Sequence, residues 1–294
     1  MHDMTTLAAS HERIHRSTKL RQKVGNTALY AIVAAISLIT VFPIYWMIVS
    51  TIQPNKFTMH YPPPFFPQEI TLRAFSALFE EHPVALWIRN SFLLALMTML
   101  ACMALTVLGA YALSSLRWKG RSAFGLFLLI TQMLPEILII IPLYIIYRGL
   151  GLLDSLPTLS LVDAAFALPI CIWILKNVFD SVPKECLDAA VVDGANELSV
   201  LWQIVLPLSA PGLVAVAVVS FFTAWNEYLF AVILLSSGNL QPATVGMTTL
   251  RNIADTPIEQ YMAAGTIFSI LPVFFYLIMQ RYIISGLTAG AVKG

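Results

Sequence analysis

Residues 180–195 read DSVPKECLDAAVVDGA and join two long apolar runs of the chain. Within this stretch Leu187, Ala190 and Val191 recur at the i, i+3, i+4 spacing that gives a helix one apolar face. Gly194 follows, and glycine is the residue that most readily adopts the positive φ of a sharp turn after a helix. The stretch therefore predicts a short helix, with Leu187, Ala190 and Val191 as its buried face, that ends in a turn at Gly194.

A second short helix is expected after this turn, through Leu201, Ile204 and Val205. It should stop before Pro207, because proline has no backbone N–H and its ring clashes with the preceding helical turn. Helices this short are marginal in water on their own. The whole connection, residues 178–209, is therefore expected to pack against another molecule.

The side chains of the first helix favour a protein as that other molecule. Ala189 and Ala190 are small and allow a partner backbone to approach closely, whereas Glu185, Asp188 and Asp193 offer charges at the rim of a contact. The alternative is an amphipathic loop that lies on the lipid headgroups. The acidic first turns of the helix count against this alternative, since an anionic leaflet repels them.

The composition of the chain indicates a protein whose main solvent is lipid. Of its 294 residues 58% are hydrophobic and only 11% are charged, whereas soluble proteins average roughly 45–50% apolar and about 25% charged residues. So few ionic groups cannot cover the surface of a soluble protein of this size. The net charge of +1 gives no indication of a nucleic-acid partner.

The residues that usually carry catalysis or bind metals form no recognisable pattern. The five histidines lie outside the apolar runs, and the three cysteines are widely spaced with no CxxC pair. The sequence also lacks the Gly-x-x-x-x-Gly-Lys-Ser/Thr loop that binds the phosphates of ATP. We therefore predict no catalytic residues, no metal site and no cofactor for this chain.

Six apolar runs are long enough to cross a membrane, which takes about 20 mostly apolar residues in a helix. Because backbone groups cannot stay unpaired in lipid, each run is predicted as an α-helix and the fold as an all-α membrane protein. The predicted membrane domain covers residues 28–285, between polar tails at 1–27 and 286–294. The first run exceeds the apolar region of a cleaved signal, so it is expected to be retained. The runs are 28–50, 87–113, 123–147, 157–177, 210–235 and 263–285.

Lysine and arginine are distributed unequally between the two sides of these helices, which sets the orientation because basic loops stay in the cytoplasm. One side holds Arg13, Arg16, Lys19, Arg21, Lys23, Arg117, Lys119, Arg121, Lys176, Lys184, Arg281 and Lys293. The other side holds Lys56, Arg73, Arg89, Arg148 and Arg251. The richer side includes both ends of the chain, so both termini and the 178–209 connection are predicted to be cytoplasmic.

The motif within the 178–209 connection resembles the EAA loop of ABC-importer permeases. It reads Asp188-Ala189-Ala190-x-x-Asp193-Gly194-Ala195, and nine residues separate Gly194 from Ile204-x-Leu206-Pro207. The family usually has Glu where this chain has Asp188, which keeps the charge and loses one methylene. The resemblance implies that the loop is a coupling helix seated in a cleft of an ATP-binding subunit. The residues that would contact this ATPase are Glu185, Leu187, Asp188, Ala189, Ala190, Val191, Asp193, Gly194 and Ala195.

Further segments resemble one branch of that family, the carbohydrate importers. The ending of the chain is close to that of the smaller, second permease subunit of the maltose importer family. The resemblance implies the type I ABC importer permease fold and a sugar or sugar derivative as the transported solute. The segments are Phe42-Pro43-Ile44-Tyr45-Trp46, Asn90-Ser91, Tyr111-Ala112-Leu113, Pro142-Leu143-Tyr144, Trp225-Asn226-Glu227-Tyr228-Leu229 and residues 286–294.

The resemblance also implies a set of partners in a bacterial inner membrane. A permease of this type forms a heterodimer with a homologous permease and works with two copies of an ABC ATPase subunit and an extracytoplasmic solute-binding protein. ATP and Mg²⁺ would bind to the ATPase, so the chain itself is not expected to be an enzyme. The tail at 286–294 would lie along the ATPase dimer, and the connection 236–262 would reach into the binding protein.

Polar residues inside the apolar runs indicate where a solute would pass, because each one is costly in lipid without a cavity or a partner. Gln132, Glu136, Asn226, Glu227 and Tyr228 are predicted to face this pathway. Amide and carboxylate groups bind sugar hydroxyls, and an aromatic face packs on the C–H surface of a sugar ring. The alternative for the polar groups is hydrogen bonding between helices.

Two other transport functions stay open from the residues. One is an ABC permease for a non-sugar solute, such as a glycerol phosphodiester. The other is a stand-alone secondary transporter, which would favour an internal repeat with broken helices at the membrane midplane. No repeat is evident in the sequence, and this second function would leave the docking motif unexplained.

Overall fold

A computed structural model describes the backbone of residues 3–252 and 256–291 and the side chains of residues 25–251 and 256–281. Every regular element within these ranges is a helix, which confirms the predicted all-α class. The chain divides into two units, Met1–Leu72 and Arg73–Gly294.

The first unit is built on one long helix, α1 (Asp3–Ile52). This helix contains the first predicted span, and its backbone also covers most of residues 1–27, which we predicted as a polar tail; the side chains of residues 1–24 lie outside the described residues. A short helix, α2 (Asn55–Thr58), and a proline-rich segment follow. The hydroxyl of Tyr45 donates to the carbonyl of Phe65 at 2.5 Å, and the two rings lie 5.4 Å apart, so this segment packs back onto α1.

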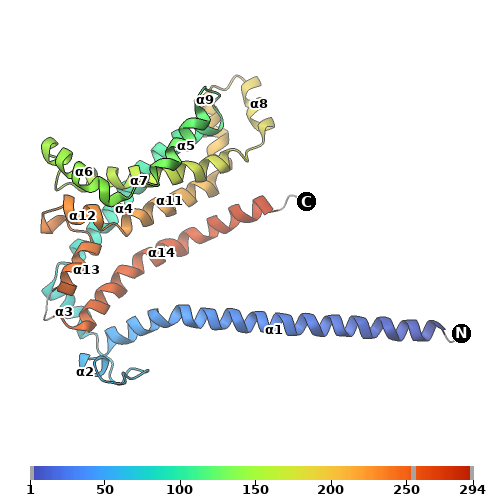
Figure 1. Ribbon diagram of the computed structural model, residues 1–294, viewed down its shortest axis with the longest axis horizontal. Helices are drawn as coiled ribbons and strands as arrows, with labels where there is room; N and C mark the ends of the chain where they lie inside the picture. Colours follow the sequence, from blue (N-terminus) through green and yellow to red (C-terminus); the bar gives the residue numbers. More distant parts are fainter. Residues whose placement is uncertain (1–2, 253–255, 292–294) are drawn as a thin grey trace. The chain divides into compact units, whose positions relative to one another are not determined.

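The second unit holds the remaining helices, which Figure 1 shows with α8 and α9 at one end and α6 and α12 at the other. In chain order they are α3 (Arg73–Glu81), α4 (Val84–Ser114), α5 (Arg121–Thr131), α6 (Glu136–Leu150), α7 (Leu156–Phe179), α8 (Lys184–Val192), α9 (Glu197–Val200), the π-helical turn η1 (Leu201–Val205), α10 (Leu206–Leu208), α11 (Ala210–Trp225), α12 (Leu229–Leu234), the 3-10 turn η2 (Gly238–Leu240), α13 (Ala243–Asn252) and α14 (Ile258–Ala291).

The described helices include four that are long and apolar enough to cross a membrane, and up to six if each bent pair of helices is taken as one span. The third predicted run, 123–147, is not one straight helix. It consists of α5 and α6, which meet at an angle of 94°. Pro135 directly precedes α6 and has no N–H to continue the hydrogen bonding of α5, so the chain turns there.

The fifth and sixth predicted runs also differ from the helices found. Run 210–235 is interrupted, because α11 ends at Trp225 and α12 begins at Leu229. The backbone of α14 continues past the predicted end at 285 as far as Ala291, into the segment predicted as a tail. Residues 292–294 lie outside the described residues.

The core of the second unit lies between α4, α7 and α11, where small side chains bring the helices close together. Cys102, Ala110 and Cys171 are fully buried there. Gly212 of α11 faces Val178 of α7 so closely that a Cβ at position 212 would lie 2.9 Å from the valine side chain. Small residues at such contacts are typical of helices that pack in a membrane, where close backbone approach replaces the hydrophobic effect.

The connection 236–262 is tied to the start of α4. The side-chain amide of Asn90 donates to the carbonyls of Asn239 and Gln241, at 2.9 and 3.0 Å, and the hydroxyl of Ser91 accepts from the amide of Ala243 at 2.8 Å. The Asn90-Ser91 pair, which contributed to the resemblance, therefore fixes the backbone of this connection in the fold.

Candidate functional site

Helix α8, which carries the docking motif, is exposed along most of its length. Ala190 is 7% exposed and packs, with Leu187 and Ala195, against the core of α4, α7 and α11. Val191 is 65% exposed, so the expectation that it shares this buried face is wrong. It lies about 100° further around the helix than Ala190 and is turned away from the core. Val191 and its neighbour Val192 thus present an apolar surface that this chain leaves open.

The turn after α8 has the conformation predicted for it. Gly194 has φ +83°, which confirms the positive φ expected there. The amide of Ala195 donates to the carbonyl of Ala190 at 2.9 Å, and the amide of Gly194 donates to that of Val191 at 3.1 Å. These are the two hydrogen bonds of a Schellman motif, in which a residue with left-handed backbone conformation ends a helix.

The second helix of the connection is longer than expected. Asn196 caps α9, since its side-chain oxygen accepts from the amide of Ser199 at 2.8 Å. The helix then widens into the π-helical turn η1 and continues through α10, which contains Pro207. The prediction that it stops before Pro207 is therefore wrong. The wider turn directly precedes the proline, where an α-helical turn would need the N–H that proline lacks.

A cavity of about 450 Å³ lies between α8 and the helix that follows the turn. Its lining combines small, polar and acidic side chains, and it includes five of the nine predicted ATPase-contacting residues, Ala189, Ala190, Asp193, Gly194 and Ala195. The remaining lining residues are Cys186, Ser199, Gln203 and Ile204. Five of the predicted docking residues thus line a concave surface, whereas Glu185, Asp188 and Val191 lie on the exposed side of α8.

Two polar contacts attach the docking loop to α4, and neither was predicted from the sequence. The hydroxyl of Tyr111 donates to the carboxylate of Glu197 at 2.8 Å. The hydroxyl of Ser114 donates to the carboxylate of Asp180 at 2.6 Å, and Lys176 forms an ion pair with the same carboxylate. The connection is therefore fixed to the end of α4 at two places, at its start and at the first residue of α9.

The carboxylate of Asp180 lies just beyond α7, outside the apolar run. Partial burial by itself would raise its pKa, but the hydrogen bonds from Lys176 and Ser114 and the charges of Lys176 and Arg121 outweigh burial and lower the pKa below its ordinary value. The carboxylate is thus held ionised at the joint between α7, α4 and the docking loop.

The breaks in the third and fifth runs bring three of the predicted pathway residues to α7. Gln132, at the end of α5, donates from its side-chain amide to the carbonyl of Phe166 at 3.0 Å. Glu136 is the first residue of α6. Glu227 accepts from the amides of Phe230 and Ala231, at 2.6 and 3.3 Å, and so caps α12. The rings of Phe166 and Phe230 are stacked, with centroids 5.1 Å apart, and join the two breaks.

Asp163 of α7 belongs to the same place, although we did not include it among the predicted pathway residues. It is 2% exposed, and neither of its carboxylate oxygens has a hydrogen-bond partner within the described residues. Glu136 and Glu227 lie close enough to act on it electrostatically. A buried carboxylate without a donor is costly, and a ligand that supplies hydroxyl or amine donors would lower this cost. The sequence did give a signal, since Asp163 is a charged residue inside an apolar run.

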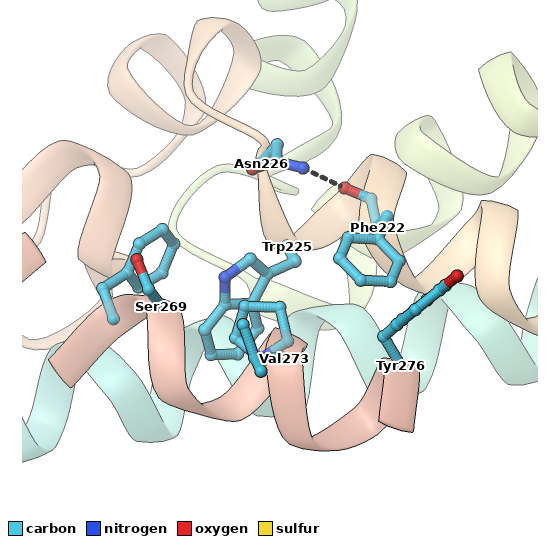
Figure 2. A pocket seen from close by; sticks show the side chains of 8 residues that line it. Phe222, Trp225, Asn226, Ser269, Val273 and Tyr276 are labelled. Carbon is cyan, nitrogen blue, oxygen red and sulfur yellow. Dashed lines mark hydrogen bonds between the residues drawn. The ribbon is translucent and has the colours of Figure 1, made fainter. Parts of the chain in front are cut away.

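Asn226 lines a cavity to which Glu136, Asp163 and Glu227 do not contribute. Its side-chain amide donates to the carbonyl of Phe222 at 2.9 Å, and the cavity, of about 380 Å³, lies between α11 and α14. Figure 2 shows this cavity, with Trp225 at its centre between Phe222 and Ser269. The indole N–H of Trp225 is buried and has no acceptor within the described residues. Tyr228, the fifth predicted pathway residue, is 40% exposed and does not line the cavity.

The comparison with known families gives a match over residues 104–288, which contain the docking loop and both helix breaks. The matching family is described as the inner membrane component of binding-protein-dependent transport systems. The chain belongs to this family. The resemblance to the permeases of carbohydrate ABC importers is confirmed.

Two relatives resemble this permease over nearly its full length. The inner membrane ABC transporter permease protein YcjP of Escherichia coli is 34% identical over 276 residues, which cover 93% of this chain and 99% of that protein. The trehalose/maltose transport system permease protein MalG of Thermococcus litoralis is 32% identical over 279 residues, which cover 94% of this chain and 100% of that protein. The family match and the apolar helices together show that this chain is a multi-pass protein of the inner membrane.

A solved structure shares the fold of this permease. It is described as the crystal structure of a bacterial ABC transporter involved in the import of the acidic polysaccharide alginate. One of its chains superposes with a TM-score of 0.77, covering 88% of this chain and 96% of that one, at 22% identity. This agreement confirms the predicted ABC-importer permease fold over most of the chain.

Proposed function

We propose that this permease is the second permease subunit of a sugar importer. In this proposal it forms the translocation pathway with a homologous partner permease, receives a sugar or sugar derivative from an external binding protein and is driven by two copies of an ABC ATPase subunit. The observation that carries the proposal is the exposed α8–α9 loop, which is fixed to α4 by Tyr111 and Ser114. The trehalose/maltose system named for one relative supports the sugar class.

The coupling step follows from how the loop is held. The exposed part of α8, with Glu185, Asp188 and Val191, would seat in a cleft of the ATPase. A displacement of α8 would pass to α4 through Glu197 and Tyr111, because charge-assisted hydrogen bonds are short and directional. Closure of the ATPase on ATP would then tilt α4 and the helices packed on it as a rigid body. The chain itself would bind neither ATP nor Mg²⁺ and would perform no catalysis.

The orientation in the proposal places both termini and the α8–α9 loop in the cytoplasm. The basic residues Arg117, Lys119 and Arg121 support it, since they lie at the same end of the unit as Asp180, to which Ser114 is bonded. The side chains of Arg13, Arg16, Lys19, Arg21, Lys23 and Lys293, which contributed to the prediction, lie outside the described residues.

The pathway in the proposal runs past the helix breaks, where Glu136 and Glu227 act electrostatically on Asp163 and Gln132 binds the carbonyl of Phe166 on the same helix. These groups are hydrogen-bond acceptors for hydroxyls, and a cluster of three acidic side chains disfavours an anionic solute. The acidic lining therefore favours a neutral or amine-bearing sugar over a glycerol phosphodiester. Asn226 and Tyr228 would contact the solute from the end of α11, while Asn226 also lines the cavity at Trp225.

Purification from the native membrane tests the proposal. The tagged chain should bring with it a P-loop ATPase and a second permease, and the purified assembly should transport a sugar into vesicles only when binding protein and ATP are supplied. Substrate is best identified by thermal-shift screening of neutral, amino and acidic sugars on the associated binding protein. Isolation of the chain alone, active in vesicles without ATP, would contradict the proposal.

A further inference from the structure

A basic pocket lies at the connection between α4 and α5, away from both the docking loop and the helix breaks. Arg117, Trp118, Lys119 and Arg121 line it, and its volume is about 360 Å³. Gly120, with φ +94°, lets the chain turn sharply between the third and fourth of these residues. Four side chains from five successive residues thus line a single concave surface.

The positive charge of this pocket is only partly balanced within the described part of the chain, where the carboxylate of Asp180 interacts with the charge of Arg121. The structure gives no ion pair for Arg117 or Lys119 within the described residues. Arg121 donates from Nη1 to the carbonyls of Ser114 and Leu116, at 3.0 and 3.3 Å, which fixes its position without removing its charge. The nearby carboxylate of Asp180 is already bound by Lys176 and Ser114 (2.6 Å from the serine hydroxyl).

The start of α5 adds to the attraction for an anion. This helix has eleven residues, and Gly120 at its N-cap position supplies no side chain to accept from the first amides. The free N–H groups and the dipole of a helix favour negative charge at its N-terminus. The pocket therefore combines three cationic side chains with the positive end of the α5 dipole.

Two aromatic side chains give the pocket an apolar edge. The indole N–H of Trp118 donates to the carbonyl of Ala112 at 2.9 Å, which fixes the ring, and the ring remains 41% exposed. The ring of Phe124 lies 6.0 Å from it. Tryptophan at the end of a membrane helix lies at the level of the lipid headgroups, with its ring against the acyl chains below them.

We propose that this pocket binds the phosphate headgroup of an anionic phospholipid. The cations and the α5 amides would bind the phosphate, and Trp118 and Phe124 would pack against the upper part of an acyl chain. The turn joins the ends of two membrane helices, which places the pocket at the headgroup level, where basic pockets between helices bind such lipids. The hydrogen bond between Ser114 and Asp180 puts the bound lipid beside the joint between α4 and the docking loop.

The test uses the full chain together with whatever subunits purify with it. The assembly is exchanged into nanodiscs of phosphatidylcholine alone or of phosphatidylcholine with phosphatidylglycerol, and retained lipids are identified by native mass spectrometry. The double variant Arg117→Gln/Lys119→Gln is compared with Arg148→Gln/Arg251→Gln, which removes the same charge from exposed residues at the other end of the unit. Lipid retention requires no transport activity, so its outcome is independent of the proposed function.

Phosphatidylglycerol should be retained in preference to phosphatidylcholine, and the Arg117→Gln/Lys119→Gln variant should bind it about thirty-fold more weakly, which equals about 2 kcal/mol. The control variant should bind it as the unchanged chain does. On the unchanged chain, added salt should weaken retention. Equal retention of the two lipids would overturn the proposal, as would displacement by inorganic phosphate at a concentration equal to that of the lipid. Full retention by the double variant, or exclusion of lipid by a partner subunit bound over the pocket, would overturn it too.

Discussion

Replacement of Gly194 by valine perturbs the shape of the α8–α9 turn and little else. No atom lies within 4 Å of the position that a Cβ would occupy there, so a larger side chain meets open space. The cost comes from the backbone, which has φ +83°. A side-chain-bearing residue pays roughly 1–2 kcal/mol in this left-handed region, and a β-branched one pays more. Such a cost lowers the ratio of the native turn to its alternative conformations by a factor of about 5–30 or greater.

The assay compares transport with ATP hydrolysis in the reconstituted assembly. The Gly194→Val variant should insert and assemble normally, because the core residues beside α8 are unchanged, yet transport per ATP hydrolysed should fall by about 5–30-fold. Gly194→Asn is the matched control, since asparagine tolerates the left-handed region best among residues with a side chain. It should retain most of the coupling. An unchanged ratio of transport to hydrolysis in the valine variant would refute the reasoning, and so would equal losses in both variants.

Three further predictions concern the contacts around the loop and the pathway. Tyr111→Phe and Glu197→Gln should each weaken the coupling of transport to ATP hydrolysis by about 1.5–3 kcal/mol of free energy. The double variant should lose no more transport than the worse single variant. Additive losses in transport would show that the two groups act separately. Asp163→Asn should leave thermal stability equal or higher, because it replaces a buried acidic group that has no hydrogen-bond partner by a neutral amide of the same size, while sugar uptake falls; a parallel loss of both would indicate a structural role instead. The lowered pKa of Asp180 stabilises the fold at neutral pH, so Asp180→Asn should lower the melting temperature there. That difference should disappear as the pH falls below about 4 and through the lowered pKa, and a difference that persists in acid would contradict the assignment.

The docking loop could be predicted in detail because its signals are local. The spacing of Leu187 and Ala190 and the glycine at 194 fix a helix and a turn within a few residues of each other. The sequence did not indicate which face meets the core, so Val191 was placed wrongly. That choice depends on the crossing of α4, α7 and α11, which are distant in sequence from the loop.

The helix breaks could not be predicted from hydropathy, because the hydropathy averaged over a window of residues is the same for a straight apolar segment and a bent one. Proline alone is not a sufficient signal either. Pro142 and Pro169 lie inside α6 and α7, whereas Pro135 lies at a turn of 94°. Neighbouring helices decide whether the backbone groups freed by a proline find partners. The convergence of Glu136 and Glu227 on Asp163 depends on these bends and was missed for the same reason.

Tyr111 and Ser114 are separated from the loop by many residues of sequence. No local sequence pattern therefore indicates that they contact it. A tyrosine and a serine at the end of an apolar run are common at membrane interfaces, so neither is distinctive on its own. Only the fold brings them to Glu197 and Asp180.

Crosslinking from Cys186 tests the central claim, that α8 docks on an ATPase, most directly. Of the three cysteines, Cys102 and Cys171 are buried and Cys186 is exposed on α8, so a thiol-reactive photocrosslinker should label the unchanged chain at this position. Irradiation of native membranes should join the chain to a P-loop ATPase, identified by mass spectrometry, and the product should be absent in Cys186→Ser. Crosslinks from Cys186 to lipid alone, with no ATPase in the product, would contradict the account.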